Sequence, residues 1–359
     1  MLSGERLFFI DPHERYFLYQ GDRTSGYLWQ LKERPSELQR IPDQFAPFSD
    51  GICGSTRDIL GVGHYPGTLF RFPLRRSPSE LSQTTYTHQH LESLLVQFES
   101  DARLLLIFLK NVECLEVLVR DEHSAEAKLR FRVQLSDDCR DSVRKSRQRI
   151  VDAIRNSSME SFSTTYLLVI ETEKYDVGLE KKTYRYWVNE MFAGGKASKV
   201  LTELRDDPSV CRIPLVGTAV DLDVTSSVNS KLSSPVHTKV EDDNSVPEDL
   251  KRVPSGRIFC FLPLAVQEVS PTGLPVHVNG YFAISQNRQH LKWPTVGQSI
   301  ESDKSLVWNH CLIAELIPQS YRDLLASATH SELFSADDVY AAIPNVVEVA
   351  EKWQVGMYT

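Results

Sequence analysis

Few side chains in this 359-residue sequence have the types and spacing that a catalytic or metal site requires. His88 and His90 form an H-x-H, but the neighbouring residues supply no complete set of metal ligands, so we expect exposed loop histidines. Gly194–Lys196 partly resembles a phosphate-binding Walker loop. However, Ala197 stands where Ser or Thr would hold magnesium, and Glu190 stands where the first glycine belongs. This pattern predicts a glycine-rich turn after an aromatic strand.

Catalytic and structural-metal signatures are otherwise absent from the sequence. It contains no G-x-S-x-G nucleophile motif and no H-E-x-x-H metal helix. The six cysteines form no C-x-x-C pair and have no histidines at zinc-finger spacing: Cys53, Cys114, Cys139, Cys211, Cys260 and Cys311. Scattered cysteines of this kind are typical of a reducing compartment, so we expect a cytoplasmic protein without a bound metal.

Charge and hydropathy narrow the classes of partner. Forty Lys and Arg against 48 Asp and Glu give a formal net charge of −8, which argues against nucleic acid, because phosphate backbones need positive surfaces. The longest apolar runs, such as Leu104–Leu109, are far shorter than the ~20 residues of a membrane span. Arg140–Arg149 carries a basic helix face that we interpret as solvated surface. Phosphate or partner binding is the alternative.

Hydrophobic periodicity predicts a mixture of strands and helices. The expected strands are Leu7–Ile10, Tyr27–Leu31, Thr68–Leu74, a meander of Leu104–Leu109, Leu115–Val119 and Leu129–Leu135, then Tyr166–Glu171, Tyr184–Met191, and a hairpin of Arg257–Val266 with Val276–Ser285. The expected helices are Leu91–Phe98, Asp137–Ile154, Trp308–Leu325 and Ser335–Trp353. Residues 224–255 are rich in Ser, Asp, Lys and Pro, which predicts a disordered loop or linker.

Several sequence motifs are more specific than a hydrophobic pattern alone. They occur in this order: Pro42–Phe48 (PDQFAPF), Tyr65–Arg75 (YPGTLFRFPLR), Trp187–Gly195 (WVNEMFAGG), Gly256–Leu264 (GRIFCFLPL) and Gly280–Trp293 (GYFAISQNRQHLKW). This series strongly resembles the sacsin repeat family of chaperones and co-chaperones, over most of the chain.

The resemblance implies a fold and an incomplete nucleotide site. Sacsin repeats begin with an ATP-binding domain of the heat-shock-protein-90 type, the Bergerat fold. The motifs that bind magnesium, adenine and phosphates in that fold precede the segment that opens here. The resemblance assigns Gly67 and Thr68 to the step that contacts adenine, and Arg288 to the arginine that the middle domain sends to the γ-phosphate. A surface ion pair is the alternative role for Arg288, and an ordinary strand position the alternative for Thr68.

The expected fold is therefore α/β (mixed α+β): the C-terminal part of a Bergerat-type sandwich at residues 1–80, then an αβα middle-type domain at 81–223 and 256–359. The expected function is part of a sacsin-like co-chaperone repeat that makes client or interdomain contacts. It would lack catalytic activity in isolation and would use ATP and magnesium only if a missing N-terminal segment completed the site. Expected partners are unfolded or client proteins and other chaperones, with self-association possible. The alternative function is an autonomous protein–protein interaction module of a larger cytosolic scaffold.

Overall fold

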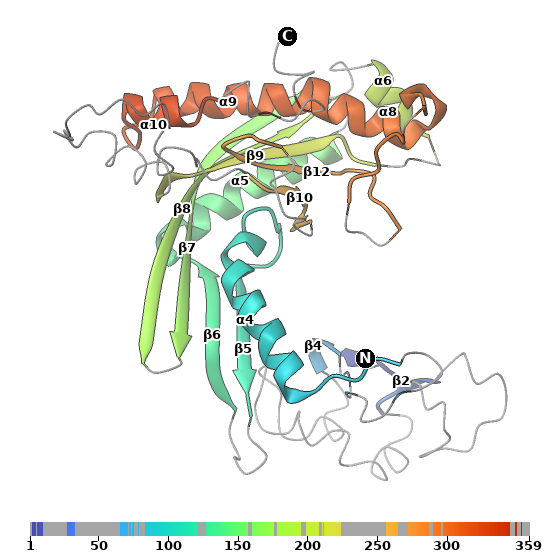
Figure 1. Ribbon diagram of the computed structural model, residues 1–359, viewed down its shortest axis with the longest axis vertical. Coiled ribbons are helices and arrows are strands. Elements are labelled where there is room, and N and C mark those ends of the chain that lie inside the picture. Colours follow the sequence, from blue (N-terminus) through green and yellow to red (C-terminus); the bar gives the residue numbers. More distant parts are fainter. Residues whose placement is uncertain are drawn as a thin grey trace, which may run out of the picture. The chain divides into compact units, whose positions relative to one another are not determined.

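The computed structural model is a mixed α/β structure, which confirms the predicted fold class (Figure 1). It describes residues 2–4, 6–9, 27–32, 65–70, 72, 74, 78, 83–120, 127–156, 160–175, 178–194, 199–207, 210, 212–223, 256–264, 272–286, 290–295, 297–344, 349 and 353. The predicted linker at 224–255 lies outside these residues. The chain forms two compact units, which are described in turn: Met1–Val96 with Leu118–Arg130, and Gln97–Val117 with Phe131–Thr359.

The first unit contains a four-stranded antiparallel sheet in the order β3-β2-β1-β4. Its strands are β1 (Leu2–Gly4), β2 (Arg6–Phe9), β3 (Tyr27–Gln30) and β4 (Tyr65–Leu69). The strands predicted at Leu7–Ile10 and Tyr27–Leu31 are confirmed within one residue of their ends.

The strand predicted at Thr68–Leu74 is placed wrongly, because β4 ends at Leu69. Phe70, Phe72 and Leu74 lie outside any strand, and all three are exposed. Apolar side chains at alternate positions predict a half-buried strand only if one face is covered, and these three have no covered face. Pro73 also lacks the backbone N–H that a continuing ladder would need.

The helix predicted at Leu91–Phe98 is longer in the structure than predicted, and its end overlaps a segment that was predicted to be a strand. Helix α4 spans His88–Leu105, and residues 106–108 form a turn, so Leu104–Leu109 is not a strand and the predicted three-strand meander loses its first member. Leu106, Ile107 and Phe108 are fully buried in that turn. A short apolar run indicates burial but cannot by itself distinguish a strand from a helix end.

The second unit is built on an eight-stranded sheet in the order β11-β10-β12-β9-β8-β7-β6-β5. Its strands are β5 (Cys114–Val119), β6 (Lys128–Leu135), β7 (Phe162–Tyr175), β8 (Leu179–Phe192), β9 (Leu215–Asp221), β10 (Ile258–Cys260), β11 (Leu262–Pro263) and β12 (His277–Gly280). β7 and β8 form a long antiparallel pair whose register runs from Phe162↔Phe192 to Tyr175↔Leu179.

The hairpin predicted from the two C-terminal strand candidates is wrong, because β10 and β12 pair in parallel. β10 instead turns back onto β11, through Phe261 in the left-handed region at φ 63°. The Phe261 backbone N–H donates to Asn279 Oδ1 at 2.9 Å, and its ring packs edge-on against Tyr281. Because β11 already makes the return, the chain reaches β12 in the same direction as β10.

Helices cover both faces of the sheet. Along β9, Val216 and Val220 pack in one hydrophobic cluster with residues of the C-terminal helices, whereas Ala219 packs in another with the end of α4 and with α5 (Asp137–Arg155). Gly217 belongs to the second face, where a Cβ would lie 2.9 Å from the Phe108 ring. The alternation of side chains along a strand therefore divides the core into two layers.

The C-terminal helices form a nearly continuous rod. α8 (Lys304–Cys311) passes through a π-helical turn, Leu312–Leu316, into α9 (Ile317–Thr329), which confirms and extends the helix predicted at Trp308–Leu325. The π turn ends two residues before Pro318, which has no backbone N–H to donate, and π turns are a common accommodation for such an interruption. Other helices within the described residues are short, among them α6 (Lys199–Arg205), a 3₁₀ turn at Ile300–Ser302, and α10 (Ala336–Ala341).

The last predicted helix, Ser335–Trp353, is not continuous: residues 342–344 and 349 lie outside any helix, Trp353 is helical, and the other residues of 345–352 lie outside the described part of the chain. α10 ends at Ala341, three residues before Pro344, which disfavours continuation of a helix. Among the described residues, no helix is both long and apolar enough to cross a membrane.

Candidate protein-contact site

The structure leaves the nucleotide-site prediction untested. Gly67 and Thr68 lie on β4, where Thr68 pairs with Ser3 of β1, and both are exposed. Arg288 lies outside the described residues, so the structure does not test whether these three positions meet. Their roles stay predictions from the family resemblance.

The other motifs of the sequence form no metal or phosphate site among the described residues. His88 and His90 are exposed, as predicted, but they lie in the first turn of α4 rather than in a loop. The His90 Nδ1 atom accepts the backbone N–H of Thr87 at 3.5 Å, which caps the helix. Gly194 is buried after β8, while the rest of the Walker-like string lies outside the described residues. No group of metal-ligating side chains gathers in the described part of the chain.

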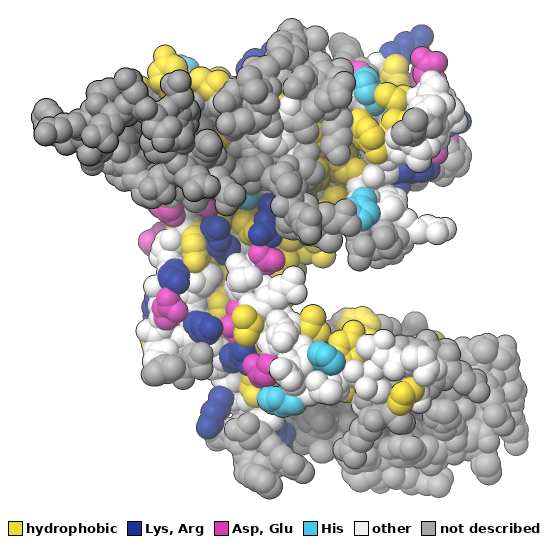
Figure 2. Space-filling model, viewed as in Figure 1, with side chains coloured by type: hydrophobic (Ala, Val, Ile, Leu, Met, Phe, Trp, Pro, Cys, Tyr) yellow, Lys and Arg dark blue, Asp and Glu magenta, His cyan; other side chains and the backbone are white. Residues whose placement is uncertain are grey.

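The basic face of α5 is largely neutralised by contacts within the chain. Arg144 binds both oxygens of Glu113, at 2.7 and 2.6 Å, and Arg140 lies 3.7 Å from the same carboxylate. Arg147 is buried and donates to the carbonyl of Leu106 at 3.0 Å. These three arginines lie on α5; on the face shown in Figure 2, dark blue and magenta side chains of other elements also lie side by side. The contacts of the three arginines support the interpretation of the helix face as ordinary surface.

A polar cluster joins the end of α4 to β8, β9 and β12. Arg103 donates to the Tyr186 hydroxyl at 2.7 Å and to Asp221 at 2.8 Å, and its guanidinium lies 4.6 Å from the Tyr184 ring centroid. His277 packs beside Tyr186, and its Nδ1 accepts the backbone N–H of Arg257, which leaves its proton on Nε2. Burial, with the positive charges of Arg103 and Arg257, lowers the pKa of His277 to about 3. Because Arg103 binds both Tyr186 and Asp221 within the cluster, we assign it a structural role.

A second cluster fixes the turn after α4. Lys110 donates to the carboxylate of Glu190, which is buried on β8. Tyr166 lies near Glu190, and burial, reinforced by that carboxylate, raises the pKa of the tyrosine. Replacing a buried ion pair by apolar residues often costs no stability, whereas removing only one of its partners is strongly destabilising. We therefore assign the Lys110–Glu190 pair a structural role in holding the turn after α4.

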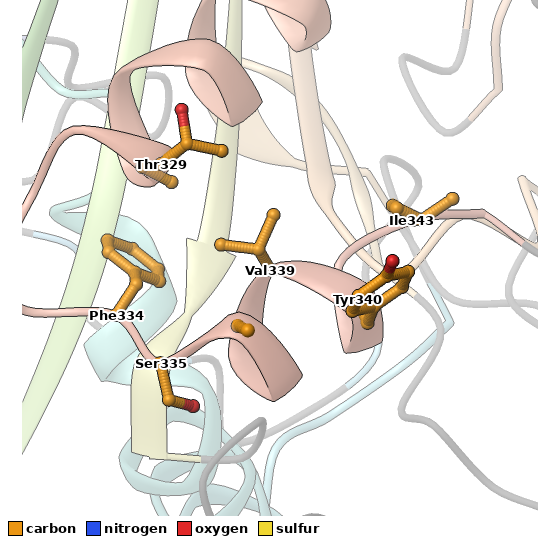
Figure 3. A pocket seen from close by; sticks show the side chains of 8 residues that line it. Thr329, Phe334, Ser335, Val339, Tyr340 and Ile343 are labelled. Carbon is orange, nitrogen blue, oxygen red and sulfur yellow. The ribbon is translucent and has the colours of Figure 1, made fainter.

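An open apolar pocket lies at the C-terminal end of α9. It has a volume of about 460 Å³, within the range of roughly 300–1,000 Å³ that is usual for ligand clefts. The end of α9, the connecting segment and α10 line it: Ala328, Thr329, Phe334, Ser335, Ala336, Val339, Tyr340 and Ile343. In Figure 3, Thr329, Phe334 and Val339 gather around one part of the pocket, with Tyr340 and Ile343 beside them.

The floor of the pocket is anchored to the sheet. The Phe334 ring packs edge-on against Trp187 of β8, with ring centroids 5.6 Å apart. The Trp187 indole N–H in turn donates to Ser327 Oγ on α9 at 2.9 Å. These two contacts hold the connecting segment on α9 and β8, so the floor is formed before any partner arrives.

Both ends of α10 are fixed as well. Ser335 caps the helix in a capping box: its Oγ accepts the Asp338 backbone N–H, and Asp338 accepts the Ser335 backbone N–H at 2.9 Å. At the other end, the Tyr321 hydroxyl donates to the carbonyl of Ala342. A short helix would be marginal alone, and these contacts stabilise it against the larger core.

The rim of the pocket is exposed and apolar. Tyr340 is 73% exposed and Ile343 is 48% exposed, and Leu333 beside the pocket is 49% exposed. Apolar side chains this exposed next to an anchored cavity are typical of a binding surface for another polypeptide.

Sequence reasoning missed this site, although part of the signal was present. Ser335 and Asp338 fit the S-x-x-D variant of a capping box, and Phe334 and Val339 fall at the positions of a hydrophobic staple. Those residues predict where α10 begins. The pocket itself depends on Trp187, about 150 positions earlier in the chain, and no local pattern could indicate that contact.

The comparisons with known proteins agree with the resemblance of the sequence. Residues 1–132 match the family model of the Sacsin domain. The mixed α/β chain is therefore a sacsin region. It is similar to human Sacsin, with 33% identity over 371 residues, an alignment that covers 99% of this chain and 7% of the human protein. The chain thus spans a small part of the length of that relative.

Proposed function

We propose that this chain is a protein-contact region of a sacsin-type chaperone, in which the α9–α10 pocket receives an apolar side chain of a client protein or of a neighbouring domain. The observation that carries the proposal is the combination of an anchored floor, Phe334 on Trp187, with an exposed rim at Tyr340 and Ile343. A preformed apolar site loses little conformational entropy on binding.

Two features of the chain support a protein partner over other classes. The net charge of −8 disfavours nucleic acid. The described residues of the first unit also expose large apolar side chains, among them Leu28, Phe70 and Phe72 at 63, 57 and 78%. Surfaces of this kind fit client or interdomain contacts in a cytosolic chaperone, and ATP chemistry would need residues beyond those described for this chain.

Site-specific photocrosslinking tests the proposal. A benzophenone amino acid replaces Tyr340 in the full chain, and the same amino acid replaces Leu179, which is 54% exposed at the start of β8, as the matched control. The probe is a single model protein, offered in its native state and after reduction and carboxymethylation. We expect crosslinks from position 340 to the unfolded form only, and few from position 179. Equal yields at the two positions, or none at 340, would contradict the proposed contact site.

A further inference from the structure

The segment that forms the pocket has a one-sided charge. Between Ala326 and Pro344, the sequence has three carboxylates and neither lysine nor arginine. Glu332 precedes the pocket residue Phe334 by two positions, and Asp337 follows the pocket residues Ser335 and Ala336 directly. Both carboxylates belong to exposed residues. The nearest described arginine on α9, Arg322, has its Nε 3.9 Å from the neighbouring Asp323.

The two exposed carboxylates are free to act on a partner, whereas the third is engaged. Asp338 accepts from the backbone N–H and the hydroxyl of Ser335, at 2.9 and 2.7 Å. Glu332 and Asp337 are not involved in that capping box. Two exposed carboxylates thus belong to the segment that lines the pocket, where their charge would favour a cationic partner, while the apolar lining favours apolar groups.

We infer that the α9–α10 pocket selects a partner segment in which a large apolar side chain is flanked by lysine or arginine. The inference rests on the proposed function and names the chemistry of the polypeptide that the pocket accepts. The apolar side chain would contact Phe334, Val339 and Tyr340, and the basic side chains would lie near Glu332 and Asp337. Charge complementarity at a rim contributes mainly to selectivity and to the rate of association.

Two fluorescent peptides of identical apolar content test the inference against the full chain. One has the sequence Lys-Leu-Leu-Lys-Phe-Leu-Lys, and the other has glutamate in place of each lysine. We expect fluorescence anisotropy to show binding of the basic peptide about tenfold tighter than that of the acidic one at low ionic strength. The difference should shrink as salt is added, because exposed charges are screened.

Substitutions then locate the effect. The double variant with Glu332→Lys and Asp337→Lys should abolish the tenfold preference for the basic peptide or reverse it. Tyr340→Ser should weaken both peptides, and the exposed Leu179→Lys on β8 should change neither. All of these residues are exposed, so the variants are expected to fold, and circular dichroism checks that they do.

The outcomes separate the two proposals. Equal affinities for the two peptides, both lost with Tyr340→Ser, would overturn the charge selectivity and leave the contact site standing. A preference that survives Glu332→Lys with Asp337→Lys would overturn the inference too, because the charge would then lie elsewhere. Binding of neither peptide would also overturn it, and the crosslinking at position 340 would decide the proposed function independently.

Discussion

Ser320 of α9 donates its hydroxyl to the Oδ1 atom of Asn189 on β8 at 2.7 Å, across 131 positions of sequence and inside the core. The amide of Asn189 in turn donates to Ser163 Oγ and Thr165 Oγ1 of β7, at 2.8 and 2.9 Å. On the other side, the Ser320 hydroxyl lies 3.1 Å from that of Thr218 on β9. One polar chain thus ties a helix to three neighbouring strands.

Replacement of Ser320 by alanine is expected to destabilise the protein by about 1–3 kcal/mol, because Asn189 Oδ1 would lose a buried hydrogen bond that water cannot replace. Urea unfolding followed by tryptophan fluorescence measures the change. Ser142→Ala, at an exposed position of α5, is the control and should shift the free energy of unfolding by less than about 0.5 kcal/mol. Equal effects of the two substitutions would contradict the role of this hydrogen bond.

Gly217→Ala is expected to destabilise by about 1–3 kcal/mol, because the new Cβ would lie 2.9 Å from the Phe108 ring and 3.3 Å from the Asn189 carbonyl oxygen. Gly178→Ala is the control, since nothing lies within 4 Å of a Cβ there. A double variant with Phe108→Leu should lose less stability than the sum of the two single variants. Strict additivity would show that the ring is not what excludes the methyl group.

Stability should fall as the pH drops below about 6.5, because His277 is held neutral in the folded state. Its folded pKa of about 3 lies below the ordinary value of 6.5, so the neutral form contributes stability that is complete above pH 6.5 and is lost as the unfolded state takes up the proton. The slope from this one group is at most about 1.4 kcal/mol per pH unit. His277→Gln should flatten the profile of unfolding free energy between pH 6.5 and 4.5, and an unchanged slope would assign the effect to other groups.

The purified chain is expected neither to bind ATP with micromolar affinity nor to hydrolyse it, because the motifs that the family uses for adenine, magnesium and phosphates are not recognised in its sequence. Isothermal calorimetry with saturating magnesium is the measurement. Micromolar binding would refute this expectation, and its loss in Thr68→Val or in Arg288→Ala would place the substituted residue in a nucleotide site.

Long periodic segments could be predicted from the sequence, and short or non-local features could not. The helix predicted at Asp137–Ile154 agrees with α5 to within one residue, because its apolar stripe repeats over five turns. The strands predicted at Tyr166–Glu171 and Tyr184–Met191 lie inside β7 and β8, but both strands are longer, at 14 residues each. Leu104–Leu109 has no such repeat, so its burial was clear but its conformation was decided by packing against Gly217 and its neighbours. The parallel pairing of β10 with β12 depends on where β11 turns the chain, which a local pattern does not report.

The candidate site shows the same division. The start of α10 is determined by neighbouring residues, because Ser335 and Asp338 form its capping box. The pocket, in contrast, depends on the contact between Phe334 and the distant Trp187 of β8. The roles that the family resemblance implies for Thr68 and Arg288 stay predictions, because Arg288 lies outside the described part of the chain. Chemistry that arises from an anchored apolar surface leaves no motif of fixed spacing, so its position becomes visible only in the fold.

The position of β9 in the sheet has a consequence for the order of assembly. Its partner β8 lies about 25 positions earlier, while its other partner, β12, lies about 60 positions later, beyond residues 224–255. Closing a longer loop costs more entropy, and non-local pairings form more slowly. We therefore expect the sheet to nucleate at the β7–β8 pair and grow outwards. β12 and β10 would join last, so a nascent chain would expose the free edge of β9 until residues 256–280 emerged.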